Sequence, residues 1–303
     1  RIGFGMDWFD RPTGGGLARS EICMLQAFSS VGKTTVALNV IRNNPHIPTL
    51  FFSLEMNWRM VAARLAAMEM VTSTQDLEKR FHQGEDVPEL GRVANRFKGL
   101  TCDDTPGIKL RQASESFERA AERMGTPPRL VVFDYLELIG GGGLAGKSEQ
   151  VDKAAATLRD WTRKHDCSTI VLHQVSQGSG GHKPMSMHEG RYGGYQPMDF
   201  VAGVYAPRLD PELDRAGFEE VRTDIYFQLL KSRSGAPDPI GKRYTLDPRC
   251  MRITPYSMMP VFHTPTVGAV KLDPLPLHLQ DDEPPVPVGA GLPARLPDDL
   301  ESF

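Results

Sequence analysis

Long hydrophobic runs are missing from this sequence, and so is any strong excess of one charge. No apolar stretch approaches the roughly 20 residues that a membrane-spanning helix needs, and no signal peptide is visible. We therefore expect no membrane partner and a cytoplasmic location. The formal net charge is only −3 over 303 residues. Overall charge does not predict nucleic-acid binding, which would depend on a local basic or glycine-rich surface.

Cysteine is scarce as well. The chain has four cysteines with no CxxC pair and no histidine at metal-ligand spacing: Cys23, Cys102, Cys167 and Cys250. This pattern is typical of free thiols in a reducing compartment and excludes a disulfide framework. Internal repeats are absent too. Hydrophobic residues make up 40% of the chain, enough for a sizeable core. The start at Arg1 instead of methionine is consistent with a piece of a longer protein.

What is present is a regular alternation of apolar runs and periodic segments. Strands are predicted at Ile22–Ala27, Thr49–Leu54, Arg129–Phe133, Ser168–His173, Phe200–Ala206 and Asp224–Lys231. Helices with apolar positions about 3.6 apart are predicted around residues 34–41, 60–68, 109–124 and 151–161. The run 129–133 is too apolar to face solvent on either side. The predicted fold class is α/β, with a mostly parallel, twisted sheet flanked by helices.

Three parts of the chain are expected. Residues 1–20 are turn-rich and are predicted to be a linker that leads into the domain, residues 21–260 the domain itself. Residues 261–303 are rich in proline and acids and are predicted to be an extended or disordered tail. Within the domain, residues 175–198 hold six glycines and are predicted to be a long functional loop.

A phosphate-binding loop is the strongest motif. Phosphate binding at a strand-to-helix turn needs inward-pointing backbone N–H groups, a lysine for the outer phosphates and a hydroxyl for Mg²⁺. The sequence after the first strand supplies these groups, so we expect ATP and Mg²⁺ as cofactors. The residues expected at the nucleotide are Ala27, Ser29, Ser30, Val31, Gly32, Lys33, Thr34 and Thr35. Lys33 would contact the β- and γ-phosphates and Thr34 the metal. Ala27 stands where this motif usually has glycine.

Three further polar residues follow predicted strands. Asp134 ends an apolar run and is the candidate second ligand of Mg²⁺; by itself, such an aspartate is a common strand terminus. Glu55 could act as general base near the γ-phosphate, or could be an N-terminal helix acid favoured by the helix dipole. Gln174 could sense the γ-phosphate, although a glutamine at a strand end is more often without special function.

Several segments together resemble the DnaB-like replicative helicases of bacteria and phages, a family of hexameric RecA-fold motors. The matching segments, over about residues 3–256, are the phosphate loop with its alanine, Phe52–Met56, Asp103–Gly107, Asp134–Leu138, His173–Gln174, and Lys231–Gly235 followed by Pro239–Gly241. The resemblance implies a RecA-like P-loop NTPase fold and removes most of the concern about Ala27. It implies Glu55 as the base that activates water and Gln174 as the γ-phosphate sensor.

The resemblance also implies residues that act between subunits. Lys231 and Arg233 are two apart, so on a strand they share one face. In a head-to-tail ring they would reach the ATP of the neighbouring subunit and stabilise charge on the transferred phosphoryl group. Without that context, they would be read as a solvated basic edge strand. Asp103 and Asp104 are expected to be structural, as turn and N-cap residues.

The loop 175–198 is where the family places DNA-binding loops, but its match to the family pattern is loose. The expected DNA-binding residues are Lys183, His188, Gly190, Arg191 and Gly193. Tyr192 and Tyr195 could stack on bases. The alternative is a flexible surface loop with incidental charges. A second loop, Gly140–Ser148 with Lys147, could also face the DNA channel.

The leading hypothesis is therefore an ATP-driven, ring-forming DNA helicase, with single-stranded DNA and a primase or loader as partners and with 5′→3′ movement if the family polarity holds. Two alternatives stay open. A RecA/RadA-type recombinase would use the same fold in a filament. A regulatory or helicase-loading ATPase would bind nucleotide without unwinding DNA.

Overall fold

The computed structural model describes residues 1–134, 136, 147–175, 180–190 and 192–256. The predicted tail 261–303, Arg191 and most of the predicted loop 140–148 lie outside the described residues. The strands are β1 (Ile22–Ala27), β2 (Thr49–Ser53), β3 (Leu100–Asp103), β4 (Leu130–Asp134), β5 (Ser168–Gln174), β6 (Phe200–Tyr205), β7 (Asp224–Ser232), β8 (Asp238–Leu246) and β9 (Ile253–Pro255). The α-helices are α1 (Asp7–Asp10), α2 (Lys33–Asn43), α3 (Trp58–Met70), α4 (Thr74–His82), α5 (Glu89–Arg96), α6 (Leu110–Met124), α7 (Lys147–Lys164) and α8 (Arg215–Val221).

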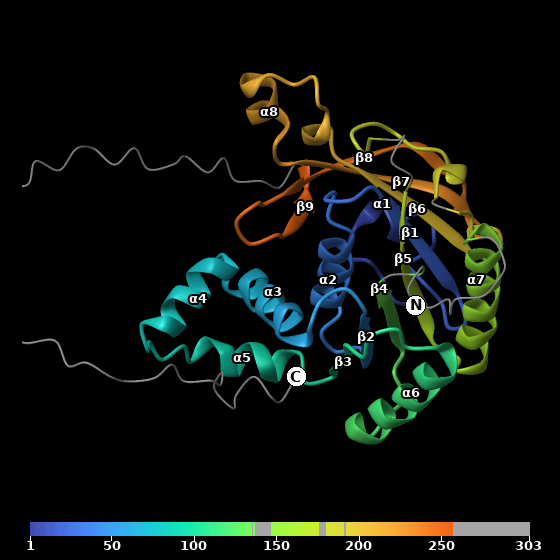
Figure 1. Cartoon of the computed structure of the whole chain (residues 1–303), viewed down its shortest axis with the longest axis horizontal. Helices are drawn as coiled ribbons and strands as arrows, with labels where there is room; N and C mark the ends of the chain where they lie inside the picture. Colours follow the sequence, from blue (N-terminus) through green and yellow to red (C-terminus); the bar gives the residue numbers. More distant parts are fainter. Residues whose placement is uncertain (135, 137–146, 176–179, 191, 257–303) are drawn as a thin grey trace, which may run out of the picture.

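The described strands form a single sheet in the order β3-β2-β4-β5-β1-β6-β7-β8-β9. The first six strands of this order are parallel, and β7, β8 and β9 are added antiparallel at one edge. This confirms the predicted α/β class with a mostly parallel sheet. Figure 1 shows α2 and α3 on one side of the sheet and α6 and α7 on the other. The carboxyl ends of the parallel strands therefore meet at one end of the sheet, where ligands bind in open α/β folds.

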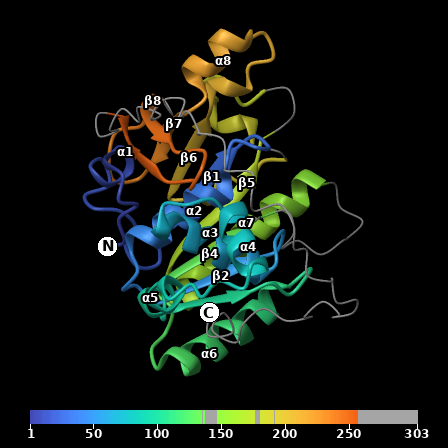
Figure 2. The same ribbon diagram turned by 90° about the vertical axis from the view of Figure 1, so that its left-hand side faces the viewer.

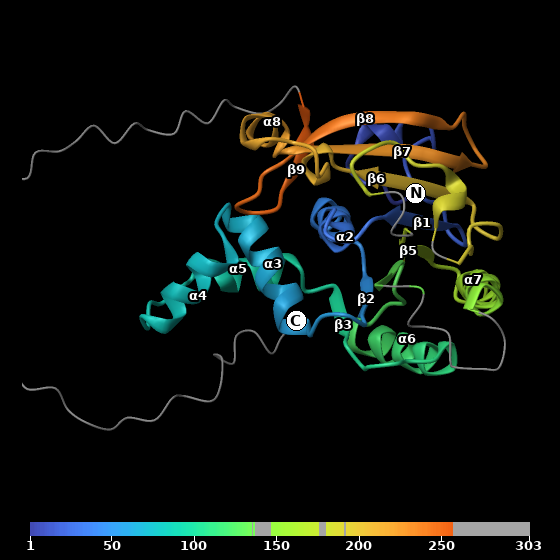
Figure 3. The same cartoon turned by 45° about the horizontal axis from the view of Figure 1, so that its top comes forward.

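Two hydrophobic clusters separate the faces of the sheet. Alternate residues of β1 enter different clusters, with Cys23 and Leu25 in one and Ile22 and Met24 in the other. The first cluster includes side chains of α2, α3 and α5, and the second includes side chains of α6 and α7. In Figure 3, α2 and α3 lie apart from α6 and α7, with the sheet between them. Burial on both faces explains why β1 is apolar over residues 22–25 and β4 over residues 130–133.

The first 20 residues pack into the domain. Ile2 pairs with Leu17 in an isolated antiparallel bridge, and both side chains are buried in the first cluster. Trp8 of α1 stacks on Phe227 of β7, with ring centroids 5.0 Å apart. The Asp10 carboxylate accepts hydrogen bonds from the backbone N–H groups of residues 4, 5 and 6. The segment predicted as a linker is therefore part of the core that covers β7, and residue 20 marks no boundary in packing.

Among the helices at the periphery, α4, α5 and α8 were not predicted, whereas α6 was. Helices α4 and α5 extend away from the sheet (Figure 1), and α8 and α6 lie at opposite ends of the molecule (Figure 2). Met60, placed on the apolar face of its predicted helix, is 45% exposed because it lies in the first turn of α3, at the edge of the packed face. Within the described residues, no helix has both the length and the apolar character to cross a membrane.

Candidate active site

The phosphate loop joins β1 to α2 through an unusual backbone. Gly32, at the N-cap of α2, has φ of 113°, and Ser30 has φ of 65°. A Cβ atom at Gly32 would meet nothing closer than 3.5 Å, so the backbone conformation and not the space requires glycine there. Ala27 is buried at the end of β1 and is not among the residues with positive φ. Alanine therefore causes no strain at position 27.

The two expected metal ligands are in direct contact. Thr34 Oγ1 donates a hydrogen bond to Asp134 Oδ2 over 2.6 Å. The Asp134 carboxyl is almost fully buried, and its other oxygen, Oδ1, is buried with no hydrogen-bond partner in the described structure. Burial raises the pKa of Asp134 to about 6, with a smaller contribution from the negative charge of Glu55, while the Thr34 hydrogen bond and the charges of Lys33 and Arg64 lower it. A buried carboxylate oxygen without a partner is costly, so this geometry favours an additional cation.

These two residues fit Mg²⁺ bound together with a nucleotide. In the part of the chain that the structure describes, no group of three or more His, Cys, Asp or Glu side chains could hold a metal ion by itself. Magnesium is commonly held by one or two protein oxygens, substrate phosphates and water. A hydroxyl and one carboxylate next to a phosphate loop supply that set.

Glu55 lies two residues beyond the end of β2, and β2 is the strand next to β4. Ser53 pairs with Asp134 in the parallel register, and Leu54 N donates to Asp134 O over 3.0 Å. Helix α3 is capped by the Asn57 side chain, which accepts from Met60 N. Glu55 is therefore not the N-cap of this helix, and its exposed side chain lines the same cavity as the phosphate loop. The alternative that Glu55 is an N-terminal acid of α3 was wrong, because the N-cap of α3 is Asn57 and its first turn holds no acidic residue.

Gln174 lies beside the start of the phosphate loop. It is paired with Ala27 in the parallel register of β5 and β1, and its Nε2 donates to Ser29 Oγ over 3.1 Å. The amide thus touches the loop that would hold the phosphates. The chain then continues into the predicted DNA-binding segment.

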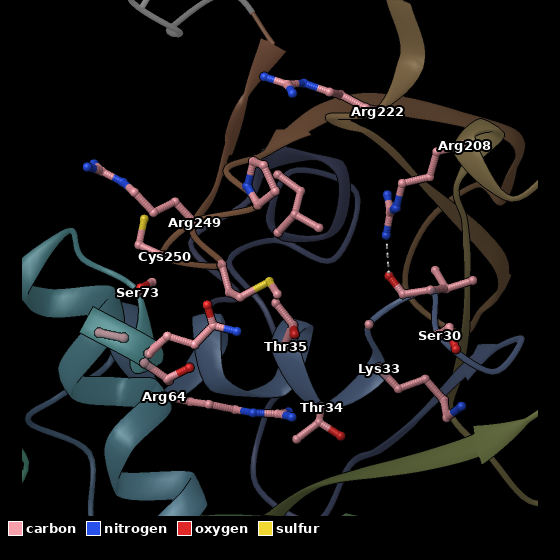
Figure 4. A pocket seen from close by; sticks show the side chains of 18 of the residues that line it. Ser30, Lys33, Thr34, Thr35, Arg64, Ser73, Arg208, Arg222, Arg249 and Cys250 are labelled. Carbon is pink, nitrogen blue, oxygen red and sulfur yellow. Dashed lines mark hydrogen bonds between the residues drawn. The ribbon is translucent and has the colours of Figure 1, made fainter. Parts of the chain in front are cut away.

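A cavity of about 990 Å³ opens over the phosphate loop. Ser29 to Thr35 and Glu55 line it, as do Leu246 at the end of β8 and residues 248–251, which follow that strand. Figure 4 shows the labelled side chains around it, with Arg64 extending from α3 toward the start of α2. Most of the residues predicted at the nucleotide therefore lie in one hollow.

None of the four arginines that line this cavity was predicted: Arg64, Arg208, Arg222 and Arg249. Arg64 is a half-buried cation on α3. Arg208, in the 3-10 turn Pro207–Leu209 after β6, donates to the carbonyl oxygen of Val31 in the phosphate loop and to that of Asp224, each over 3.0 Å (Figure 4). Burial lowers the pKa of Arg208. In the sequence, Arg64 is one polar position of a predicted helix, and Arg208 is a single arginine after a predicted strand. Neither belongs to a motif that indicates a nucleotide contact.

Lys231 and Arg233 lie at the opposite end of the sheet. Ala27 is in register with Val204, and Val204 with Phe227, whereas Ser232 is in register with Phe200 at the start of β6. Arg233 is six residues beyond Phe227, roughly 20 Å further along at about 3.3 Å per residue. It forms an ion pair with Asp199 over 2.7 Å. Neither cation is placed to reach the phosphate loop of its own chain.

The predicted DNA-binding residues separate into two groups. Lys183 and His188 are exposed, and His188 Nδ1 hydrogen-bonds with the Tyr195 hydroxyl over 2.7 Å. Gly190 is buried, and a Cβ there would lie 2.5 Å from the Gln26 side chain, so close packing requires this glycine.

Gly193 is partly buried. Its Cβ would lie 2.8 Å from Asp152 Oδ1, so Gly193 too is held closely against a neighbouring element, helix α7. Arg191 lies outside the described residues, so its predicted role is not addressed by the structure.

Asp103 and Asp104 have structural roles, as expected. Asp103 accepts from Thr105 N in a turn, and Asp104 accepts from Trp58 N at the start of α3. Neither caps α6, whose N-cap position is Lys109.

The fold and the site together define a RecA-like P-loop NTPase domain. The family model for the DnaB-like helicase C-terminal domain matches residues 2–188, which is more than half of the chain. The chain therefore belongs to the DnaB-like helicase family.

Named relatives agree with this assignment. The replicative DNA helicase DnaC of Bacillus subtilis is 30% identical over 251 residues, 78% of this chain and 52% of the relative. The replicative DNA helicase DnaB of Geobacillus stearothermophilus is 30% identical over 182 residues, 57% of this chain and 39% of the relative. The chain thus spans about half, or less, of the length of these curated relatives.

Solved structures agree on the fold. A structure of a DnaB-like replicative helicase and its interactions with primase superimposes with a TM-score of 0.72 at 19% identity, covering 84% of this chain and 61% of the other.

Proposed function

We propose that this chain is the motor of an ATP-driven, ring-forming replicative DNA helicase that moves along single-stranded DNA. One observation carries the proposal. Glu55, Asp134 and Gln174 surround the phosphate loop at one end of the sheet, whereas Lys231 and Arg233 lie at the other end. A head-to-tail ring, hexameric as in the family, brings the second group of one subunit to the first group of the next. Family membership supports 5′→3′ movement.

ATP would lie in the cavity with its phosphates on the loop at residues 27–35. Lys33 and the backbone N–H groups bind the phosphates. Thr34 and Asp134 would hold Mg²⁺, which would supply positive charge that offsets the charge of the phosphates. A water oxygen forms a bond to the γ-phosphorus while the bond from that phosphorus to the β–γ bridging oxygen breaks. Glu55 takes the proton of the water, and the neighbour's cations stabilise the charge on the phosphoryl group, leaving ADP and phosphate.

Gln174 supports a link from ATP to DNA. Its side chain already contacts the phosphate loop at Ser29, and the chain from β5 continues directly into residues 175–198. We infer that this segment contacts the backbone of single-stranded DNA, through the exposed Lys183 and His188 and through Arg191. Stacking on Tyr192 and Tyr195 adds affinity without sequence preference. A primase or a loader is a further candidate partner of the ring.

A mixing experiment tests the shared site. Lys33→Ala removes the phosphate contact of one site, and Arg233→Ala removes the trans contribution to the next. Each variant alone should lose ATP hydrolysis, by on the order of 10³-fold for Arg233→Ala. Mixed subunits should regain part of the activity, because some interfaces pair an intact phosphate loop with an intact Arg233. Arg19→Ala, which removes an exposed ion pair with Asp166, is the matched control.

Strand displacement distinguishes this function from the alternatives. The chain should displace a labelled strand from a forked duplex in an ATP-dependent reaction, with a free 5′ tail required on the strand it follows. Filaments with strand exchange would indicate a recombinase. ATP hydrolysis with neither activity would indicate a regulatory or loading ATPase, and a mixture with no regained hydrolysis would contradict the shared site.

A further inference from the structure

Arg233 is held within its own subunit by a buried carboxylate. Arg233 Nη1 lies 2.7 Å from Asp199 Oδ1; the Asp199 side chain is 7% exposed and that of Arg233 is 47% exposed. The second oxygen of Asp199 accepts from Ile22 N, the first residue of β1, over 3.0 Å. The carboxylate is thus fixed to the sheet, and the arginine is the more accessible partner.

Lys231 is held by the same stretch of chain. Its Nζ donates to the carbonyl oxygens of Gln196 over 2.8 Å and of Tyr195 over 3.3 Å. Burial lowers the pKa of Lys231, and the charge of Arg233 lowers it further. The segment 195–199 therefore binds both cations that the proposed function assigns to the neighbouring site. Residues 195–198 of this segment are the end of the predicted DNA-binding loop 175–198, and Asp199 follows it directly.

Helix α7 anchors the other side of this segment. Gly194 N donates to Asp152 Oδ1 over 2.7 Å, and Ser148 Oγ donates to Tyr192 O over 3.0 Å. A displacement of residues 183–190 and 192–195 by a bound strand would therefore act directly on the Tyr195 contact of Lys231, four residues before the Asp199 contact that holds Arg233.

A second arginine lowers the free-energy cost of releasing Arg233 from Asp199. Arg159 of α7 lies 3.5 Å from the same Asp199 oxygen, and its side chain is only 17% exposed. Removing one partner from a buried ion pair is strongly unfavourable when the remaining charge is left unpaired. When Arg233 leaves, Asp199 keeps both Arg159 and the Ile22 N–H group. Asp199 thus keeps a charged partner and a hydrogen-bond donor whether or not Arg233 is bound to it.

We propose that Asp199 is a positioning residue that retains Arg233 in its own subunit until DNA engages residues 183–190 and 192–195, and that Arg159 neutralises Asp199 once Arg233 moves to the neighbour's ATP. The inference rests on the trans role proposed for Arg233. Without DNA, the contact between Arg233 and Asp199 competes with the contact between Arg233 and the neighbour's ATP. ATP hydrolysis is therefore slow until DNA binds.

Two substitutions should change the basal rate in opposite directions. Asp199→Asn keeps an acceptor for Ile22 N but weakens the hold on Arg233, so hydrolysis without DNA should rise about threefold to fivefold. The rate with saturating oligothymidylate should stay the same, so the stimulation ratio should fall. Arg159→Gln leaves Arg233 as the only charged partner of Asp199, so the basal rate should fall about threefold. A purely structural role would lower the basal rate in both variants.

Matched controls come from an exposed pair of similar geometry. Arg19 Nη1 lies 2.7 Å from Asp166 Oδ2, with both side chains more than half exposed. Asp166→Asn and Arg19→Gln should leave the basal rate and the stimulation ratio unchanged. Sedimentation and thermal unfolding of all four variants show whether assembly and folding are retained.

The inference is overturned if folded, assembled Asp199→Asn has a basal rate at or below that of the unaltered chain. If Asp199→Asn does not fold, Arg159→Gln decides alone. The proposal expects a lower basal rate with an unchanged rate at saturating oligothymidylate, whereas a raised or unchanged basal rate, or an equal fall of both rates, rejects it. Failure of the proposed function looks different. In that case Arg233→Ala retains full hydrolysis, whatever Asp199 does.

Discussion

The two ends of the central sheet differ in how complete they are. At the carboxyl end of the parallel strands, the segments that follow β1 and β2 line one cavity, and Thr34 and Asp134 already touch. At the other end, Lys231 and Arg233 are occupied by contacts within the chain, and neither lines that cavity. One chain supplies a binding site, whereas the second group acquires a role only when another copy is present. Assembly is therefore expected to control catalysis more than binding.

The largest effect is expected at the preformed end. Lys33→Ala should lower the rate of ATP hydrolysis on the order of 10³-fold, because it removes a positive charge at the developing negative charge, and should weaken nucleotide binding as well. Steady-state hydrolysis and fluorescent-nucleotide titration measure the two effects. Lys98→Ala, an exposed lysine outside the cavity, should behave like the unaltered chain. Normal turnover in Lys33→Ala would refute the assignment of the site.

Glu55→Gln separates chemistry from binding at the same end. A glutamine keeps the shape but cannot accept the proton of the water, so hydrolysis should fall about 10²-fold or more. Nucleotide affinity should change little, in contrast to Lys33→Ala. Single-turnover hydrolysis and nucleotide titration on one preparation make the comparison. A retained rate would show that another group is the base.

The pH dependence of Mg²⁺ binding tests the Asp134 carboxyl. Its pKa is raised to about 6 by burial, and a metal ligand must be deprotonated. In the nucleotide-bound protein, the apparent Mg²⁺ affinity should fall about tenfold per pH unit below about pH 6. Asp134→Asn should bind Mg²⁺ weakly, with little dependence on pH. Equal affinity at pH values on both sides of 6 would contradict the assignment.

The same group should affect stability with a definite sign. Between its ordinary pKa of 3.8 and about 6, the folded chain binds more protons at Asp134 than the unfolded chain does. The contribution of this group to the free energy of unfolding therefore falls as pH rises through that window. Bound Mg²⁺ should restore the loss at higher pH, which urea unfolding with and without Mg²⁺-nucleotide would show.

The smallest effect is expected at Arg208, which links the phosphate loop to β7. Arg208→Ala removes hydrogen bonds to Val31 O and Asp224 O and should cost about 1–3 kcal/mol of unfolding free energy, with a modest loss of nucleotide affinity. Arg222→Ala is the control. Arg222 lines the same cavity but pairs with Glu219 on the exposed helix α8. Equal effects of both substitutions would show that Arg208 does not support the loop specifically.

The sequence predicted the elements whose pattern is strong. Strands β1 and β4 each begin with four consecutive apolar residues, and α6 carries Ala113, Phe117 and Ala120 on one buried face. The elements that escaped have weak patterns. Strand β3 has only four residues, of which Leu100 alone is buried, and α4 buries only Leu77. Residues 1–20 look like turns because their buried aromatic side chains, Phe4, Trp8 and Phe9, pack on distant strands instead of forming a periodic face.

The candidate site divides in the same way. Glu55, Asp134 and Gln174 follow apolar strands, so parallel pairing brings them to the phosphate loop. The contact between Arg233 and Asp199 depends on the register of an antiparallel strand that no local pattern states. Gly190 was read as a phosphate contact because glycine in a loop suggests exposed N–H groups, whereas the structure places it against Gln26 and His173.

Position 27 shows that the phosphate-loop motif is too narrow when it requires glycine at its first place. The backbone there has no positive φ, the residue fills a buried strand end, and its carbonyl oxygen accepts from Lys33 Nζ over 3.4 Å. Every one of these requirements is met by a small residue with a methyl group. A pattern search that demands glycine at the first place of the loop would pass over this chain, although its chemistry is intact. A search keyed to the left-handed glycine at position 32 and the Lys-Thr pair after it would not.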